Sequence, residues 1–271
     1  MGAETVKEVR SLSQYILISI AIALFFFFVI LPLTSTFQFA FEDGAGEFFA
    51  AISTEGAINA LQNSIIIATF ATFINLCVGT LIAFVITRYK FPGRQVFKAL
   101  IDLPIAIPTA VVGLSLMMLY GPMGLLGPLM EDNAIEIMMA MPGVLLAHIF
   151  VTFPFMVRAV SVVLEKHDIS QEEAAQTLGA NKTQIFTKVT LPSIRSGMVA
   201  GAALTFTRSL GEFGATLFVA GGMVQTAPLY IYYLSNSEFN FQAASSMAIV
   251  LMILPFALLL ILNYIVEKME A

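Results

Sequence analysis

Six long apolar segments constrain this chain of 271 residues more than any other feature. Each is long enough to cross a bilayer core of about 30 Å, which takes about 20 helical residues. A segment that spans lipid must be a helix or part of a closed barrel, because lipid offers its backbone no hydrogen bonds. The alternating pattern of barrel strands is absent, so the sequence predicts an all-α membrane protein. The expected transmembrane helices are residues 15–35, 63–87, 99–120, 138–163, 197–220 and 243–266.

The domain organisation that follows is simple. We expect an N-terminal tail of residues 1–14 and a single transmembrane domain of residues 15–271, with its core at 60–266. The first apolar run exceeds the ~7–15 residues of a signal peptide and no small-residue cleavage site follows it, which predicts a retained helix. The single cysteine, Cys77, lies in the second helix, so it has no partner for an internal disulfide and is interpreted as a small core residue.

Apart from Arg208, the basic residues lie in one set of loops and tails or in the helices that adjoin them. The three other loops carry acidic residues and no Lys or Arg. The positive-inside rule therefore puts both termini and residues 164–196 in the cytoplasm. A net charge of −5 also gives no basic surface for nucleic acid. The orientation rests on the basic residues Lys7, Arg10, Arg88, Lys90, Arg94, Lys98, Arg158, Lys166, Lys182, Lys188, Arg195 and Lys268.

A polar island at residues 172–192 separates the fourth and fifth apolar segments. Ser170, with Glu173 three residues on, predicts a capping box at the start of a short helix. Gly179 supplies the left-handed residue that ends it, and Asn181 with Gln184 can start a second helix, which we expect to finish before Pro192. This pattern is typical of a docking element for a soluble partner, or of an ordinary cytoplasmic loop with some helix.

Three charged residues lie in or at the edge of the expected membrane helices: Asp102, Arg208 and Glu212. Charge in lipid is costly, so such residues usually face an aqueous path or pair with one another. Arg208 and Glu212 are one turn apart and can form an ion pair. The pair belongs either to a path or gate or to a neutralised packing contact. Prolines after Asp102 predict a bend near the cytoplasmic end of the third helix.

The sequence lacks the residues that several kinds of chemistry require. No glycine is followed by lysine, so a phosphate-binding P-loop is absent, and the two histidines and Cys77 form no metal-ligand pattern. An intramembrane protease would need a serine facing a histidine, and Ser115 with His148 is the sole candidate. His148 is better explained as a hydrogen-bonding residue in helix packing. We therefore expect no catalytic residue, metal or cofactor.

The polar island resembles the EAA loop of ATP-binding-cassette importer permeases. The resemblance rests on Glu172 with Glu173-Ala174-Ala175, on Gly179 six residues after Glu173, and on Leu191-Pro192; Val189 stands where the family usually has isoleucine. The resemblance implies that residues 164–196 are a coupling loop that inserts into a groove on an ATPase subunit. The residues implied in coupling are Glu172, Glu173, Ala174, Ala175, Gly179, Leu191 and Pro192.

Further motifs resemble the sulfate/thiosulfate branch of that family, over roughly residues 88–249. Molybdate and tungstate permeases are close relatives and remain the alternative. The resemblance implies a second permease subunit (a copy or a paralogue), two ATPase subunits and an extracytoplasmic anion-binding protein. The motifs are Phe91-Pro92-Gly93-Arg94-Gln95, Leu100-Ile101-Asp102-Leu103-Pro104, Gly124-Leu125-Leu126-Gly127-Pro128, Ile149-Phe150-Val151-Thr152-Phe153-Pro154-Phe155 and Gly211-Glu212-Phe213-Gly214-Ala215.

Two other classes remain as rivals. An ion-coupled secondary transporter should show inverted repeats with broken helices at the midplane, and the two halves of this sequence show no repeat. A membrane enzyme would need a convergent polar site, which the sequence lacks. Acidic outer loops are poor anion traps, so capture of an oxyanion by a separate binding protein is also what the electrostatics favour.

Overall fold

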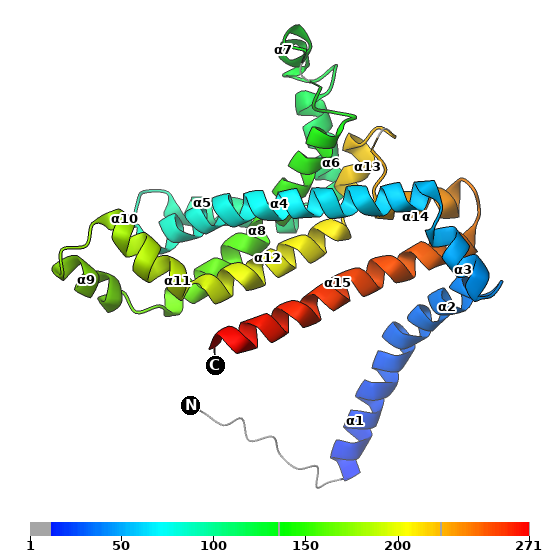
Figure 1. Ribbon diagram of the computed structural model, residues 1–271, viewed down its shortest axis with the longest axis horizontal. Helices are drawn as coiled ribbons and strands as arrows, with labels where there is room; N and C mark the ends of the chain where they lie inside the picture. Colours follow the sequence, from blue (N-terminus) through cyan, green and yellow to red (C-terminus); the bar gives the residue numbers. More distant parts are fainter. Residues whose placement is uncertain (1–11, 135, 223, 271) are drawn as a thin grey trace.

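The computed structural model describes residues 12–134, 136–222 and 224–270, and within them it is helical with no β-strand. Four long helices are α4 (Glu55–Arg88), α8 (Met141–Lys166), α12 (Arg195–Leu210) and α15 (Phe241–Glu270). Helices α4, α8 and α12 contact one another pairwise, and α15 packs on α12 (Figure 1). The predicted all-α class is confirmed.

Small residues let the central helices pack closely. The buried face of α4 repeats every three or four residues, and a Cβ added at its Gly79 would lie 2.7 Å from Met156 Cγ of α8. Likewise, a Cβ at Gly201 of α12 would lie 2.7 Å from Met156 Sδ. Such residues allow helices to approach where lipid supplies no hydrophobic drive. The buried residues of α4 are Ala57, Ala60, Ser64, Ile67, Ala68, Ala71, Asn75, Gly79, Thr80, Ala83 and Ile86.

Four stretches in the described residues are long and apolar enough to cross a membrane, where the sequence predicted six: Leu12–Ala40, Glu55–Arg88, Met141–Lys166 and Phe241–Leu258. The expected third span is instead two helices, α5 (Arg94–Ala106) and α6 (Thr109–Tyr120), which meet at 107°. Pro108 causes this break, because it lacks an N–H and forces Ile107 into an extended conformation. The predicted bend is confirmed, and counting the pair as one span gives five.

The expected fifth span, residues 197–220, is also broken. Helix α12 ends at Leu210, and the short helix α13 (Gly214–Val219) begins after an irregular turn at 211–213. The uninterrupted helix predicted there is therefore wrong. Gly214 packs so closely on Thr109 of α6 that an added Cβ would clash with its hydroxyl, whereas Gly211 meets no side chain.

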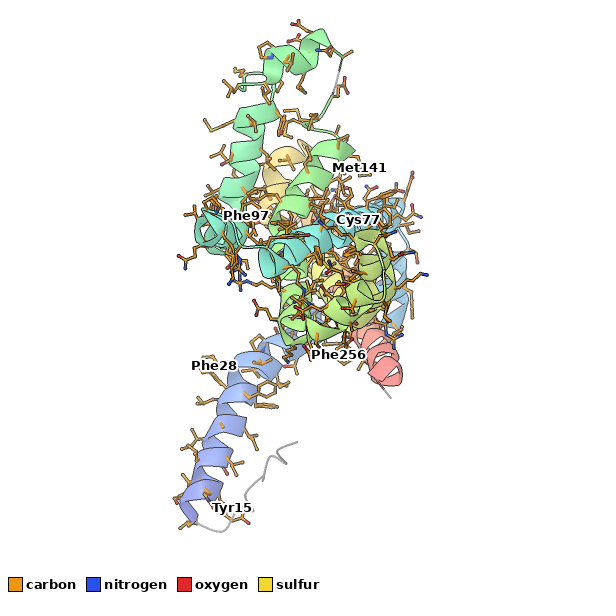
Figure 2. The ribbon with its side chains drawn as sticks, turned by 90° about the vertical axis from the view of Figure 1, so that its left-hand side faces the viewer. Tyr15, Phe28, Cys77, Phe97, Met141 and Phe256 are labelled. Carbon is orange, nitrogen blue, oxygen red and sulfur yellow. The ribbon has the colours of Figure 1, made fainter. Side chains whose placement is uncertain are left out.

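The first helical stretch starts well away from the other helices, and its last part packs on α15 (Figure 1). It consists of α1 (Leu12–Phe25), a π-helical turn (Phe26–Ile30) and α2 (Leu31–Ala40), and α1 buries none of its side chains. Figure 2 shows Tyr15 and Phe28 on this protruding part. An apolar helix exposed on all sides fits a membrane environment. The expected tail of residues 1–14 and its basic residues Lys7 and Arg10 lie largely outside the described residues.

Outside the loop at 164–196, the structure also has the short helices α3 (Ala45–Ile52), α7 (Gly127–Asp132) and α14 (Ala227–Asn236). Pro128 of the Gly124–Pro128 motif lies in the first turn of α7. The first turn accommodates proline because its N–H groups have no partner within the helix. Helices α3 and α14 pack on the end of α4 opposite to the loop at 164–196 (Figure 1).

Candidate functional site

The loop after α8 forms the predicted helix–glycine–helix. Helix α9 (Ser170–Thr177) is terminated by Gly179 two residues on. The φ of Gly179 is +87°, in the left-handed region that glycine tolerates. The Gly179 N–H donates to the Gln176 carbonyl (2.9 Å) and the Ala180 N–H to the Ala175 carbonyl (3.1 Å). These two bonds form a Schellman motif, which satisfies the last carbonyls of the helix. The role predicted for Gly179 as a helix terminator is confirmed.

The start of α9 differs from the prediction. Ser170 and Glu173 do not form a capping box, because Ile169 before them already has helical dihedral angles and Ser170 is the first residue of the helix. Asp168 provides a hydrogen bond to the start of the helix in place of the capping box, because its Oδ1 accepts the Ser170 N–H at 2.9 Å. This backbone hydrogen bond holds the pKa of the Asp168 carboxyl below its usual value.

The second helix, α10 (Lys182–Ile185), starts with the predicted capping box. Asn181 Oδ1 accepts the Gln184 N–H and Gln184 Oε1 accepts the Asn181 N–H, both at 2.9 Å. The expectation that this helix ends before Pro192 is wrong. A π-helical turn (Phe186–Thr190) and α11 (Leu191–Ser193) carry the helix through Pro192, which occupies the first turn of α11 where its missing N–H is tolerated.

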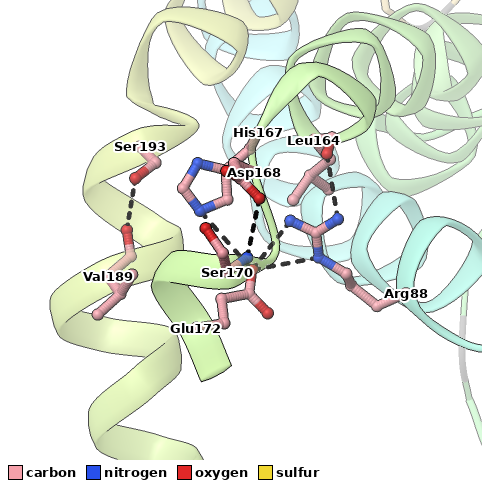
Figure 3. A network of polar contacts seen from close by, with 8 residues as sticks. All are labelled: Arg88, Leu164, His167, Asp168, Ser170, Glu172, Val189 and Ser193. Atoms are coloured by element: carbon pink, nitrogen blue, oxygen red, sulfur yellow. Dashed lines mark hydrogen bonds and ion pairs between the residues drawn. The ribbon is translucent and has the colours of Figure 1, made fainter. Parts of the chain in front are cut away.

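Glu172 and Glu173 of the predicted motif face different ways. Glu172 has a side chain only 15% exposed, and its Oε1 accepts hydrogen bonds from Nε (3.2 Å) and Nη2 (2.9 Å) of Arg88 at the end of α4 (Figure 3). Arg88 Nη1 donates to the Leu164 carbonyl of α8 at 3.2 Å, and His167 Nε2 lies 3.9 Å from the Glu172 carboxylate. Glu173 is exposed. The loop therefore presents one glutamate outward and uses the other to contact the bundle.

A cavity of about 510 Å³ lies between this loop and α4. Leu81, Phe84 and Tyr89 line it from α4 and its end, and Ile169, Gln176 and Phe186 line it from the loop. The rings of Phe84 and Phe186 meet edge to face, with centroids 5.2 Å apart. The space therefore lies under both halves of the loop, and the contact between Phe84 and Phe186 joins the second half to α4 beside it.

The predicted pair of Arg208 and Glu212 is present at the break between α12 and α13. Arg208 Nη2 lies 2.7 Å from Glu212 Oε2, and the Glu212 side chain is 1% exposed whereas that of Arg208 is 34% exposed. Glu212 Oε1 accepts the Ala215 N–H at 2.9 Å. One carboxylate therefore both neutralises the cation and caps the start of α13.

His148 joins the two sides of the same break. Its Nδ1 lies 2.7 Å from Ser209 Oγ of α12 and its Nε2 lies 2.9 Å from Thr216 Oγ1 of α13. This confirms the prediction that His148 is a hydrogen-bonding residue in helix packing. Ser115 instead donates to the Val111 carbonyl at 2.8 Å, so the serine and histidine of a protease are not brought together.

Asp102 has a partner that the sequence did not indicate. Arg158 Nε donates to its Oδ1 at 2.8 Å, and both side chains are well exposed. No interaction found among the described residues joins Asp102 to Arg208 or Glu212. The three predicted path residues therefore fall into two separate ion pairs, one of which includes Arg158. Across residues 12–134, 136–222 and 224–270, no group of three His, Cys, Asp or Glu side chains is placed to hold a metal ion.

The chain is similar to known transport proteins. Residues 75–269 match the family model described as "Binding-protein-dependent transport system inner membrane component". The chain belongs to this family. Its membership confirms the importer resemblance and agrees with a multi-pass membrane protein.

Individual relatives of this transport family are more specific. The sulfate transport system permease protein CysW of Synechocystis is 38% identical over 258 residues, covering 94% of this chain and 93% of that one. The CysT permease of Salmonella typhimurium is 38% identical over 219 residues, covering 80% and 79%. Among solved structures, a chain of a bacterial alginate ABC transporter shares the fold at a TM-score of 0.79 and 18% identity, with coverage of 94% and 93%.

Sequence reasoning missed several residues of this transport component. Arg88 entered only the count of basic residues, although its place at the end of a long apolar helix could have indicated a contact with the loop. Arg158 is likewise a cation near the end of an expected span, the one that contains His148, and this position could have indicated a contact with an acidic residue. Ser209 and Thr216 carry no signal, because hydroxyl residues are common in membrane helices.

Proposed function

We propose that this chain is the permease subunit of an ATP-binding-cassette importer that carries sulfate or thiosulfate. The observation that carries the proposal is the 38% identity to a sulfate transport permease over nearly the full length of both chains. The subunit itself is non-catalytic and needs no cofactor. Energy comes from separate ATPase subunits, and an extracytoplasmic binding protein delivers the anion to a pair of permease subunits, of which this chain is one.

Residues 164–196 are the coupling loop and face the cytoplasm, together with both termini. Exposed Glu173 and Ala174 on α9, and Leu178 with 88% of its surface exposed, are the groups that contact the ATPase. Gly179 fixes the angle between α9 and α10, and Leu191-Pro192 carry the second helix into α12. The seven proposed coupling residues are Glu172, Glu173, Ala174, Ala175, Gly179, Leu191 and Pro192.

The translocation path involves Arg208 and Glu212, with Asp102 near its cytoplasmic end. Arg208 is partly exposed while its partner is buried, so guanidinium donors remain for a passing oxyanion. Glu212 reduces the net charge there. A weak site is what transport requires, because a bare cation would hold a dianion too tightly to release it.

Reconstitution of the whole transporter tests the proposal. The chain, a second permease, the ATPase and the binding protein are placed in proteoliposomes, and accumulation of radiolabelled sulfate is measured with Mg-ATP. We expect accumulation that persists when a protonophore collapses the proton gradient and that excess thiosulfate inhibits. Transport of molybdate or tungstate without sulfate would contradict the anion assigned. Accumulation by the chain alone, driven by a proton gradient, would make it a secondary transporter.

A further inference from the structure

One guanidinium joins three helices where the coupling loop begins. Arg88 is the last residue of α4, contacts Glu172 of α9 through two nitrogens and reaches the Leu164 carbonyl of α8 with the third (Figure 3). We propose that Arg88 is a positioning residue that fixes α9 to the ends of α4 and α8, so that motion of the loop moves both membrane helices. The inference rests on the proposed function of the loop.

The two glutamates of α9 have different roles: Glu173 docks on the ATPase, and Glu172 transmits motion to the membrane helices. Successive residues on a helix point about 100° apart, so Glu172 and Glu173 differ in exposure and in contacts although both border the cavity under the loop. Glu173 is exposed and available to a partner, whereas Glu172 is 15% exposed and its carboxylate is engaged by Arg88. A force applied at the outer face of α9 therefore reaches the bundle through the inner glutamate.

Apolar packing does not replace this link. The cavity of about 510 Å³ lies between α4 and both halves of the loop, and Glu172 is one of the residues that line it. The Glu172–Arg88 contact therefore stands beside a space that side chains leave open. The second half of the loop has its own attachment, the edge-to-face contact between Phe84 and Phe186. The first half thus depends on a polar link and the second half on an aromatic one.

Arginine suits this position better than lysine. Its planar fork donates from three nitrogens to two acceptors on different helices, and the Arg88 side chain is only 11% exposed. The Leu164 carbonyl belongs to the last turn of α8, where helix carbonyls lack partners and a cation is favourable. A lysine ammonium is a point donor that cannot span the same acceptors.

The test uses the full reconstituted transporter and measures sulfate carried per ATP hydrolysed. We expect Arg88→Gln and Glu172→Gln to lower this ratio about tenfold while the ATPase still co-purifies with the permease. Arg88→Lys should fall in between. The exchange Arg88→Glu with Glu172→Arg should recover part of the ratio lost in either single reversal, because the opposite charges are again adjacent.

Two controls separate transmission from docking and from general charge effects. Glu173→Gln should reduce co-purification of the ATPase instead of the ratio. Lys98→Gln removes the cation of an exposed ion pair of 3.7 Å between α5 and α8 and should leave both measurements unchanged. An Arg88→Gln transporter with a normal ratio, or one that loses the ATPase as Glu173→Gln does, would overturn the inference.

A second measurement does not depend on the anion. Spin labels at Thr177 of α9 and at the exposed Val162 of α8, in a Cys77→Ser background, report the distance between the loop and the bundle. We expect one distance with and without a non-hydrolysable ATP analogue in the wild type, and a nucleotide-dependent distance in Arg88→Gln. If the distance responds to nucleotide in the same way in the wild type and in Arg88→Gln, the inference is contradicted. A wild-type transporter that carries no sulfate contradicts only the proposed function.

Discussion

The ion pair between Arg208 and Glu212 allows a quantitative prediction because its two members differ in burial. Glu212 is 1% exposed and receives Arg208 on one oxygen and the Ala215 N–H on the other, whereas Arg208 is 34% exposed. The perturbations are Arg208→Met, Glu212→Gln and the double variant. Each replacement keeps roughly the original volume and removes one charge, or both.

The expected losses of stability are unequal. Arg208→Met leaves a buried carboxylate with one backbone donor, and breaking a buried pair in this way costs about 3–5 kcal/mol. Glu212→Gln retains an acceptor for Ala215 and leaves a cation that can turn toward its exposed side, so about 1–2 kcal/mol is expected. Replacing both charges by neutral groups of similar size should cost less than about 1.5 kcal/mol.

Unfolding of the purified protein in detergent by added SDS measures these values. Far-UV circular dichroism is the suitable signal, because the chain has no tryptophan. The double variant should be more stable than Arg208→Met, with a coupling energy of at least about 2 kcal/mol in the double-mutant cycle. Additive effects, within about 0.5 kcal/mol, would show that the two charges do not stabilise one another.

Three further predictions follow from the site. Gly179→Val should abolish uptake while the protein still reaches the membrane. Gly93→Val, at another left-handed glycine with open space around it, carries a comparable strain of about 1–2 kcal/mol and should keep uptake. His148→Leu removes a partner from Ser209 and Thr216 and should cost about 2–4 kcal/mol in the SDS titration, with His148→Gln less harmful. The purified chain alone should neither bind nor hydrolyse ATP in a nucleotide-binding and phosphate-release assay, since it has no P-loop.

Local patterns were readable from the sequence because their physical basis is local. Gly179 ends a helix and Asn181 with Gln184 starts one, and each involves groups within a few residues. The same holds for Arg208 with Glu212, which are one helical turn apart. Ser170 failed as a cap because the chain before it was already helical, which a three-residue spacing does not reveal.

Contacts between distant segments could not be read in this way. Arg88 and Glu172 are 84 positions apart, and Asp102 and Arg158 are 56 apart, so no periodicity links them. The broken fifth span was missed for another reason. Hydropathy averages over a window and does not register that residues 211–213 leave the helix, although Glu212 inside that window was a visible sign of a polar interruption.

The position of α12 suggests how energy used outside the membrane can act inside it. Moving a dianion into a negative-inside cell costs about 2.3 kcal/mol per charge per 100 mV, so about 4.6 kcal/mol before any concentration gradient. The proposed source is an ATPase that meets the chain at the coupling loop. Helix α12 starts at Arg195, at the end of that loop, and finishes at Leu210, beside Glu212 and its partner Arg208. A rigid helix of 16 residues is about 24 Å long at 1.5 Å per residue. Because His148 clamps the far end of α12 to α13, a displacement of the loop reaches the charge pair without a change in the helix itself.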